Sequence, residues 1–188
     1  MKIENQRELP CSQAEAWAAL NDEAMLQACI PGCESLTREG EQLQLLVMAA
    51  VGPVRARFKG QLQMQDVVAP VSYAMRFEGQ GGVAGFGKGL AQVRLSVIDE
   101  QRCLLHYSAD VQIGGKLAQI GSRVVDAAAQ KIIGDFFARL EQALQARQPQ
   151  LPLLPAPAAP PAGLLARLWA WLRVRVGLGA LPSSLDQA

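Results

Sequence analysis

The chain is poor in the side chains from which most catalytic sites are built. Its 188 residues include a single histidine, His106, and only 5% aromatic residues. His106 is out of phase with Leu105 and Tyr107 in an alternating run, so it is predicted to face solvent, where it would be a poor base for a serine or cysteine nucleophile. No two carboxylates share the inward face of a predicted strand. We therefore predict no catalytic residues and a protein that is not an enzyme.

Cysteine is scarce and scattered. The four cysteines (Cys11, Cys29, Cys33 and Cys103) are too few for a disulfide scaffold and are interpreted as reduced thiols. The stretch Cys29-Ile-Pro-Gly-Cys33 resembles half of a zinc site, but no second pair of ligands follows. The sequence therefore predicts no metal site.

Strong charge bias is also absent. The formal net charge is +1, which gives no support for a nucleic-acid partner. The opening residues, MKIENQRELP, alternate in charge and contain no long apolar run, so no secretory signal is predicted. Together with the unpaired cysteines, this favours a cytoplasmic location.

The composition changes near residue 148. Residues 149–162 contain six prolines together with alanine and leucine, and no charged residue. Such a segment favours an extended polyproline-type spacer and cannot continue a preceding helix. We therefore predict a folded domain over residues 1–148, a linker over 149–162 and a tail over 163–188.

The tail carries apolar residues at helical spacing together with three arginines. A short amphipathic helix with tryptophan and arginine is typical of a membrane interface, although docking on a protein groove or on the folded domain is the alternative. The residues predicted to contact the membrane are Leu164, Leu165, Leu168, Trp169, Trp171 and Leu172. Because Arg175 falls within the apolar face, the pattern is imperfect.

Most of the predicted domain shows the period of antiparallel strands. In residues 54–64, Val54, Ala56, Phe58, Leu62 and Met64 alternate with arginine, lysine and glutamine. Similar runs predict a sheet of six to seven strands, preceded by two short helices with capping residues at Ser12 and Asp22. After Gly115 the apolar residues recur every fourth position, which predicts one helix of about thirty residues across the sheet. A cavity between the two is the expected ligand site.

Residues 79–89 contain six glycines, and the run is one residue short of a phosphate-binding loop. Gly89 stands where that motif needs serine or threonine, and a strand pattern follows where it needs a helix, so nucleotide binding is not favoured. We interpret the run as a flexible loop at a cavity rim or a partner-docking surface. Its candidate residues are Gly79, Gly81, Gly82, Gly85, Phe86, Gly87 and Lys88.

Four stretches in the correct order strongly resemble the carbon monoxide dehydrogenase CoxG family: ACIPGCESL, VGPVRARFKG, EGQGGVAGFGKG and IGGKLAQIGSRVVD. That family belongs to the START-like (SRPBCC, Bet v 1-like) superfamily. The resemblance implies an α+β helix-grip fold, in which a bent antiparallel sheet surrounds a long C-terminal helix and a hydrophobic cavity.

The resemblance also implies an accessory function. Family members accompany molybdenum hydroxylases of the carbon monoxide dehydrogenase type and are thought to recruit the enzyme to the inner face of the cytoplasmic membrane. It implies no cofactor, with a quinone as the expected apolar ligand. A START-like enzyme of the polyketide cyclase type, or a general carrier of lipids, is the alternative.

The candidate ligand-binding residues are those expected on inward faces. They are Trp17, Met25, Phe58, Met64, Phe77, Leu95, Tyr107, Ile120, Val124 and Phe136. For any single one of them, an ordinary core position is the favoured interpretation.

Overall fold

The protein is described by a computed structural model that covers residues 1–147 in structural detail. The predicted linker (149–162) and tail (163–188), including every residue proposed to contact a membrane, lie outside the described residues. The limits of these two segments therefore stay predictions.

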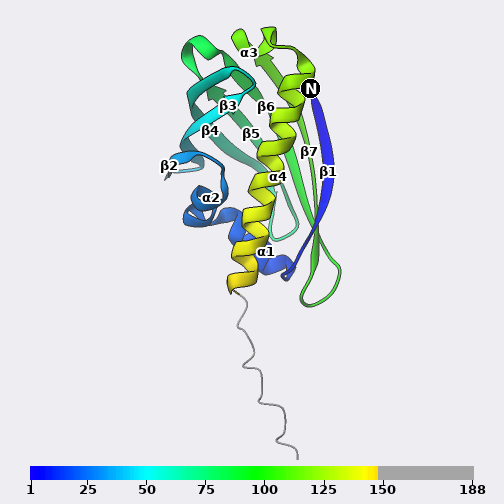
Figure 1. Ribbon diagram of the computed structural model, residues 1–188. Helices are drawn as coiled ribbons and strands as arrows, with labels where there is room; N and C mark the ends of the chain where they lie inside the picture. Colours follow the sequence, from blue (N-terminus) through cyan, green and yellow to red (C-terminus); the bar gives the residue numbers. More distant parts are fainter. Residues whose placement is uncertain (148–188) are drawn as a thin grey trace, which may run out of the picture. The chain divides into compact units, whose positions relative to one another are not determined.

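Seven antiparallel strands form one sheet in the order β1-β7-β6-β5-β4-β3-β2 (Figure 1). The strands are β1 (Lys2–Leu9), β2 (Cys33–Glu39), β3 (Gln42–Val51), β4 (Val54–Val68), β5 (Ser72–Gln80), β6 (Phe86–Val97) and β7 (Cys103–Gly114). Strands β2 to β7 follow one another as a meander, and β1 pairs with the last of them. The predicted sheet, and the alternation that places Phe58 and Leu62 on its inner face, are confirmed.

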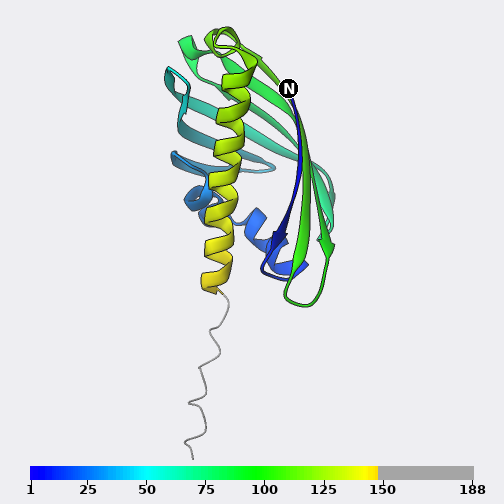
Figure 2. The same ribbon diagram turned by 45° about the vertical axis from the view of Figure 1, so that its right-hand side comes forward.

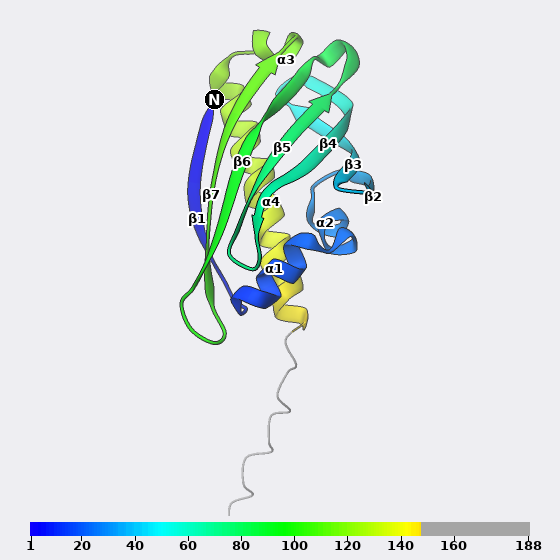
Figure 3. The same cartoon turned by 180° about the vertical axis from the view of Figure 1, so that it is seen from behind.

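Two short helices connect β1 to β2. Helix α1 (Gln13–Asn21) begins with the predicted capping box, in which Ser12 and Glu15 each bond the backbone of the other. Asp22 accepts from the Met25 backbone N–H and thereby caps α2 (Glu23–Cys29). Both helices lie at one end of the sheet (Figure 3), whose outer face is covered by none of the described helices.

The predicted single helix after Gly115 is broken into two. Helix α3 (Lys116–Gln119) is followed by α4 (Ser122–Arg147), and Gly121 between them has φ +93°, which no right-handed helix can contain. Helix α4 runs along the inner face of the bent sheet (Figure 2). Within α4 the inward residue is Val125 and not Val124: at about 100° per residue, Val125 lies about 60° around the helix from the buried Leu140 and Val124 about 160°. Val125 is accordingly buried and Val124 is 40% exposed.

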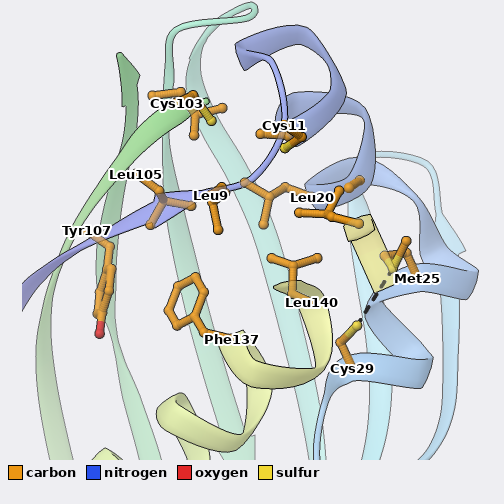
Figure 4. Close-up of a cluster of buried hydrophobic side chains, with 14 of the residues drawn as sticks. Leu9, Cys11, Leu20, Met25, Cys29, Cys103, Leu105, Tyr107, Phe137 and Leu140 are labelled. Atoms are coloured by element: carbon orange, nitrogen blue, oxygen red, sulfur yellow. Dashed lines mark hydrogen bonds between the residues drawn. The ribbon is translucent and has the colours of Figure 1, made fainter. Parts of the chain in front are cut away.

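The main core fills the end of the sheet that carries α1 and α2. Leu9, Leu105 and Leu140 are among its fully buried side chains, and they bring together β1, β7 and the C-terminal half of α4 (Figure 4). A smaller cluster of Leu26, Leu36 and Leu43 lies beneath α2. The packed core thus occupies one half of the sheet's inner face, and the other half is left for a cavity.

The prediction of a long glycine loop is wrong. Strand β5 continues to Gln80 and β6 begins at Phe86, so only residues 81–85 connect them, with a short 3-10 turn, η1 (Gly82–Ala84). Backbone geometry requires glycine inside this turn, since Gly82 and Gly85 have φ of +59° and +112°. Gly79, Gly87 and Gly89 instead belong to the strands, and a run rich in glycine is not by itself a loop.

Candidate functional site: an apolar cavity between the sheet and helix α4

A cavity of about 420 Å³ lies between the inner face of the sheet and the N-terminal half of α4. Its wall is formed by β1, by β3 to β7, by α3 and by the first three turns of α4. The apolar side chains in the wall are Met1, Ile3, Leu45, Val47, Ala49, Val51, Phe58, Leu62, Phe77, Ala109, Val111, Ile113, Leu117, Val125, Ala129, Ile132 and Ile133. The cavity therefore lies on the half of the inner face that α1 and α2 leave uncovered.

The strands that form this wall direct no polar side chain into the cavity. Glu78 borders the cavity, but strand alternation places its side chain on the outer face, where it accepts a hydrogen bond from Gln80 Nε2 at 2.9 Å. The backbone groups of the central strands are paired in the ladder. An uncharged, largely apolar molecule is the kind of ligand that such a wall can hold without leaving a polar group unsatisfied.

Three glycines form a row across the middle of the cavity floor. Gly60 of β4 pairs with Gly79 of β5, which pairs in turn with Gly87 of β6. The row is continued by Leu45 of β3 at one end and by Ile113 of β7 at the other. All five residues line the cavity. The Leu45 side chain reaches over Gly60, where a Cβ would lie 2.9 Å from it, so the bare backbone in the centre of the floor is that of Gly79 and Gly87.

Two phenylalanines border this glycine row, one on each side. A Cβ placed on Gly81 would lie 2.5 Å from the Phe58 ring, and one placed on Gly89 would lie 2.8 Å from the Phe77 ring. Each ring thus lies over a neighbouring glycine and could not do so over a larger residue. The rings are held down on the sheet, which keeps the space above the glycine row free.

Two of the ten predicted ligand-binding residues, Phe58 and Phe77, line the cavity. The structure places four others in the main core: Met25 and Leu95 are 5% and 1% exposed, Tyr107 is 9% exposed, and Trp17 packs against the same cluster. The reason is that α1, α2 and the end of α4 cover their half of the sheet. Alternation identifies the inner face but not which half of it is filled.

The remaining four predicted residues lie outside the cavity wall. Phe136 packs between the two core clusters, and Met64 pairs with Met75 on the core half of the sheet. Ile120 and Val124 lie against the β3–β4 hairpin, where a Cβ on Gly52 would come within 2.7 Å of Val124 Cγ1. Neither of these two residues lines the cavity.

Of the seven residues predicted for the glycine loop, Gly79 and Gly87 line the cavity floor. Gly81, Gly82 and Gly85 form the turn between β5 and β6, and Phe86 is 40% exposed with its ring over Gly114. Lys88 lies on the outer face, opposite Glu78. Sequence reasoning missed most of the aliphatic wall, although the alternation of Ala109, Val111 and Ile113 already marked one strand of it.

Several groups buried in the core have shifted pKa values, among them two tyrosines and Cys11. Burial raises the pKa of Tyr73 to about 12. Burial also raises the pKa of Tyr107, an effect that the nearby Arg7 guanidinium partly offsets, and the Tyr107 hydroxyl is the one buried side-chain polar atom of the described residues that has no hydrogen-bond partner. A hydrogen bond with Cys103, and then burial, raise the pKa of Cys11. These groups belong to the packed half of the sheet and not to the cavity wall.

A larger hollow of about 780 Å³ lies on the outer face of the sheet. It is bordered by long polar side chains, among them Gln61, Gln63, Arg76, Glu78 and Lys88. Because the lining of this hollow is mostly polar and that of the inner cavity is almost wholly apolar, we take the smaller inner cavity as the candidate ligand site.

Two further observations bear on the kind of protein this is. Within residues 1–147, no helix is both long and apolar enough to cross a bilayer. In the same residues, no three or more histidine, cysteine, aspartate or glutamate side chains gather in a way that could hold a metal ion.

Comparison with known proteins gives one family match and many structural neighbours. The carbon monoxide dehydrogenase CoxG family matches residues 6–145. No curated protein matches the sequence significantly. A conserved protein from Geobacillus kaustophilus is similar with 26% identity and a TM-score of 0.74, covering 78% of this chain and 96% of that one.

Two more distant structures share the fold. A START superfamily protein from Mycobacterium smegmatis has 16% identity and a TM-score of 0.59, covering 77% of this chain and 97% of that one. The Zhui aromatase/cyclase from Streptomyces sp. R1128 has 12% identity and a TM-score of 0.59, covering 78% and 94%. These neighbours confirm the predicted helix-grip fold of the START-like superfamily.

Proposed function

The chain belongs to the carbon monoxide dehydrogenase CoxG family, and on this ground we propose that it is a non-catalytic accessory protein that carries an apolar ligand. The observation that supports the carrier function most directly is the cavity of about 420 Å³, whose wall consists of aliphatic side chains, two phenylalanines and glycine backbone. Burying a hydrocarbon surface there would contribute about 25 cal/mol for each Å² removed from water.

The proposed ligand is a quinone. An uncharged ring with an isoprenoid chain has the apolar character that the wall requires. The test is mass spectrometry of lipids extracted from the purified full chain. A quinone recovered in proportion to the protein supports the proposal, whereas recovery of none from protein that was purified without detergent would contradict it.

The proposed partner is a molybdenum hydroxylase of the carbon monoxide dehydrogenase type, as the family description suggests. The protein would recruit this enzyme and exchange electrons with it through the bound quinone. Affinity purification of the hydroxylase from the native host should retain the chain. Quinone reduction by the purified hydroxylase should rise when the chain is added, and an unchanged rate would count against an accessory role.

The proposed membrane contact is made at the cytoplasmic face through the apolar residues of the tail, of which Trp169 and Trp171 are the largest. We would compare flotation on anionic liposomes between the full chain and a full-length variant with both tryptophans changed to serine. Loss of flotation in the variant supports the anchor. Equal flotation of the two proteins would show that the tail does not bind the membrane.

The alternative is a START-like enzyme of the polyketide cyclase type. The similarity to the Zhui aromatase/cyclase, at 12% identity, concerns the fold alone. Cyclisation needs polar groups that can move protons at the substrate, and the apolar wall favours a carrier over this alternative.

A further inference from the structure

The glycines at positions 79 and 87 have no function in the fold that the structure reveals. Neither has a positive φ, so the backbone at both positions suits any residue. A Cβ on Gly87 would meet nothing within 4 Å, and one on Gly79 would meet only the Gly87 carbonyl oxygen at 3.9 Å. In this they differ from Gly89, where a Cβ would lie 2.1 Å from the Asp110 carbonyl oxygen.

Glycine inside a strand is unfavourable by roughly 0.5–1 kcal/mol relative to alanine, because it loses more conformational freedom on folding. Two such residues, paired with each other and adjacent to Gly60, lie where a side chain would point into the cavity. The feature they share is the empty space above them. The absence of a side chain at these two positions is therefore explained by the cavity and not by the fold.

The space above the row is flat and narrow. The Leu45 side chain covers Gly60, so the open strip of backbone is that of Gly79 and Gly87, which are one strand spacing of about 5 Å apart, with Leu45 at one end. The backbone groups of this strip are already paired in the sheet, and Phe58 and Phe77 border it on either side. A hydrocarbon chain would fill any apolar hollow, but a flat strip between two aromatic residues fits a planar ring best, since such a ring lies against the backbone and contacts the phenylalanines.

We propose that the open part of the glycine row, Gly79 and Gly87, with Leu45 over Gly60 at its end, is the ring-binding part of the cavity and selects planar, uncharged rings over puckered ones. This inference rests on the proposed function as a carrier of apolar ligands. It adds the part of the ligand that is recognised and the residues that recognise it. A puckered ring system of the same size is thicker, and it would stand off the backbone and lose contact.

The test compares two probes with the same carbon skeleton, a naphthylethanol with a planar aromatic ring system and its fully hydrogenated decalin analogue with a puckered saturated one. Their affinities for the full chain are measured by titration calorimetry. We expect the wild-type protein to bind the naphthyl probe at least about tenfold more tightly, after correction for the different water solubilities of the two probes. In Gly79→Val and Gly87→Val, whose new side chains cover the strip, this preference should disappear.

The matched control is Lys88→Val, which places a valine side chain next to Gly87 but on the outer face of the sheet. It should keep the wild-type preference. Thermal unfolding shows whether each variant is folded. If a valine variant is not folded, Gly87→Ala replaces it, since the structure leaves open space for the smaller side chain. A crystal structure with the naphthyl probe gives an independent reading of where the ring lies.

The possible results separate the two proposals. Equal affinity of the wild type for both probes, a preference that persists in folded Gly79 and Gly87 variants, or a ring bound away from the row would overturn the ring-binding assignment while leaving an apolar-ligand carrier intact. Failure of the wild type to bind either probe would overturn the carrier function, and the assignment with it.

Discussion

The ring of Tyr107 on β7 stacks on the ring of Phe137 on α4, with centroids 5.2 Å apart and 29° between the ring planes. The Arg7 guanidinium lies over the Phe137 ring, 5.5 Å from its centroid. This stack joins the sheet to the helix just below the cavity. The Tyr107 hydroxyl within it is buried without a hydrogen-bond partner, so the contribution of this residue to stability comes from its ring alone.

Replacing Tyr107 by phenylalanine should therefore leave the protein as stable as before, or more stable by up to about 1 kcal/mol, because the change keeps the ring stack and removes an unsatisfied polar group. Urea unfolding of the two proteins measures the difference. Tyr107→Leu is the matched comparison and should be less stable than both. A loss of more than about 1 kcal/mol in Tyr107→Phe would show that the hydroxyl has a partner in solution.

Tyr73 should make the protein sensitive to alkali. Its ring is 8% exposed and meets Trp17 edge to face at 5.6 Å, and burial raises its pKa to about 12. Because the pKa is higher in the folded than in the unfolded state, the stabilising effect is complete below the unfolded pKa, near 10, and is lost as the pH rises towards 12. The loss is at most roughly 3 kcal/mol for a shift of this size.

The measurement is the unfolding free energy between pH 9 and pH 11.5, with a parallel spectrophotometric titration of tyrosine. Tyr73→Phe should flatten the pH dependence, whereas Tyr107→Phe should change it less. An identical slope in the wild type and Tyr73→Phe would mean that Tyr73 titrates as an exposed tyrosine.

The two halves of α4 should differ in what they contribute to stability. Leu140 is 0% exposed in the packed core, and Ile132, two turns earlier, is 36% exposed in the cavity wall. Leu140→Ala should cost about 2–5 kcal/mol, since it opens a hole that the surroundings cannot fill. Ile132→Ala should cost less than about 1 kcal/mol in the unliganded protein, since the residue already borders empty space. Equal losses would show that the N-terminal half of α4 packs as tightly as the rest.

The cysteines should differ in reactivity. Cys11, Cys29 and Cys103 are at most 2% exposed, and this inaccessibility sets them apart, since burial raises the pKa of Cys33 as well as that of Cys29. Cys33 is only partly buried, with its thiol donating to the Ser35 carbonyl oxygen. In the native protein a thiol reagent should therefore modify Cys33 first and the other three only on unfolding. Cys33→Ser should abolish the fast phase, and rapid labelling that survives this change would contradict the order.

The sequence contains enough information for the strands, the caps and the inner face, because alternation and capping depend on neighbours within a few residues. Such local patterns do not reveal which half of the inner face is packed and which half borders the cavity. Trp17 and Phe58 carry the same signal, yet one packs beside the core and the other lines the cavity, since α1 and α2 cover only one end of the sheet. The inward face of α4 includes Val125 instead of Val124 because a row of residues spaced by four drifts around the helix by about 40° at each step, which carries Val124 away from the side of Leu140.

The glycine row is hidden in the sequence for a related reason. Gly60 and Gly79 are nineteen positions apart in sequence, and only the register of β4 with β5 brings them together. Taken singly, glycines predict turns, and the run at 79–89 predicts a loop in the same way. Strand pairing brings the same residues together on one surface, and only a three-dimensional structure shows which residues are paired.

The glycine row also has a thermodynamic consequence for the unliganded protein. Three glycines paired across neighbouring strands make the folded sheet less stable than a sheet with alanine at these positions, by an amount on the order of 2 kcal/mol. A bound molecule stabilises the folded state by RT ln(1 + L/Kd), where L is the free ligand concentration, and so offsets this deficit only while it is present. Loaded and empty protein should thus melt at separate temperatures, and a melting curve with two transitions would report what fraction of the molecules holds cargo.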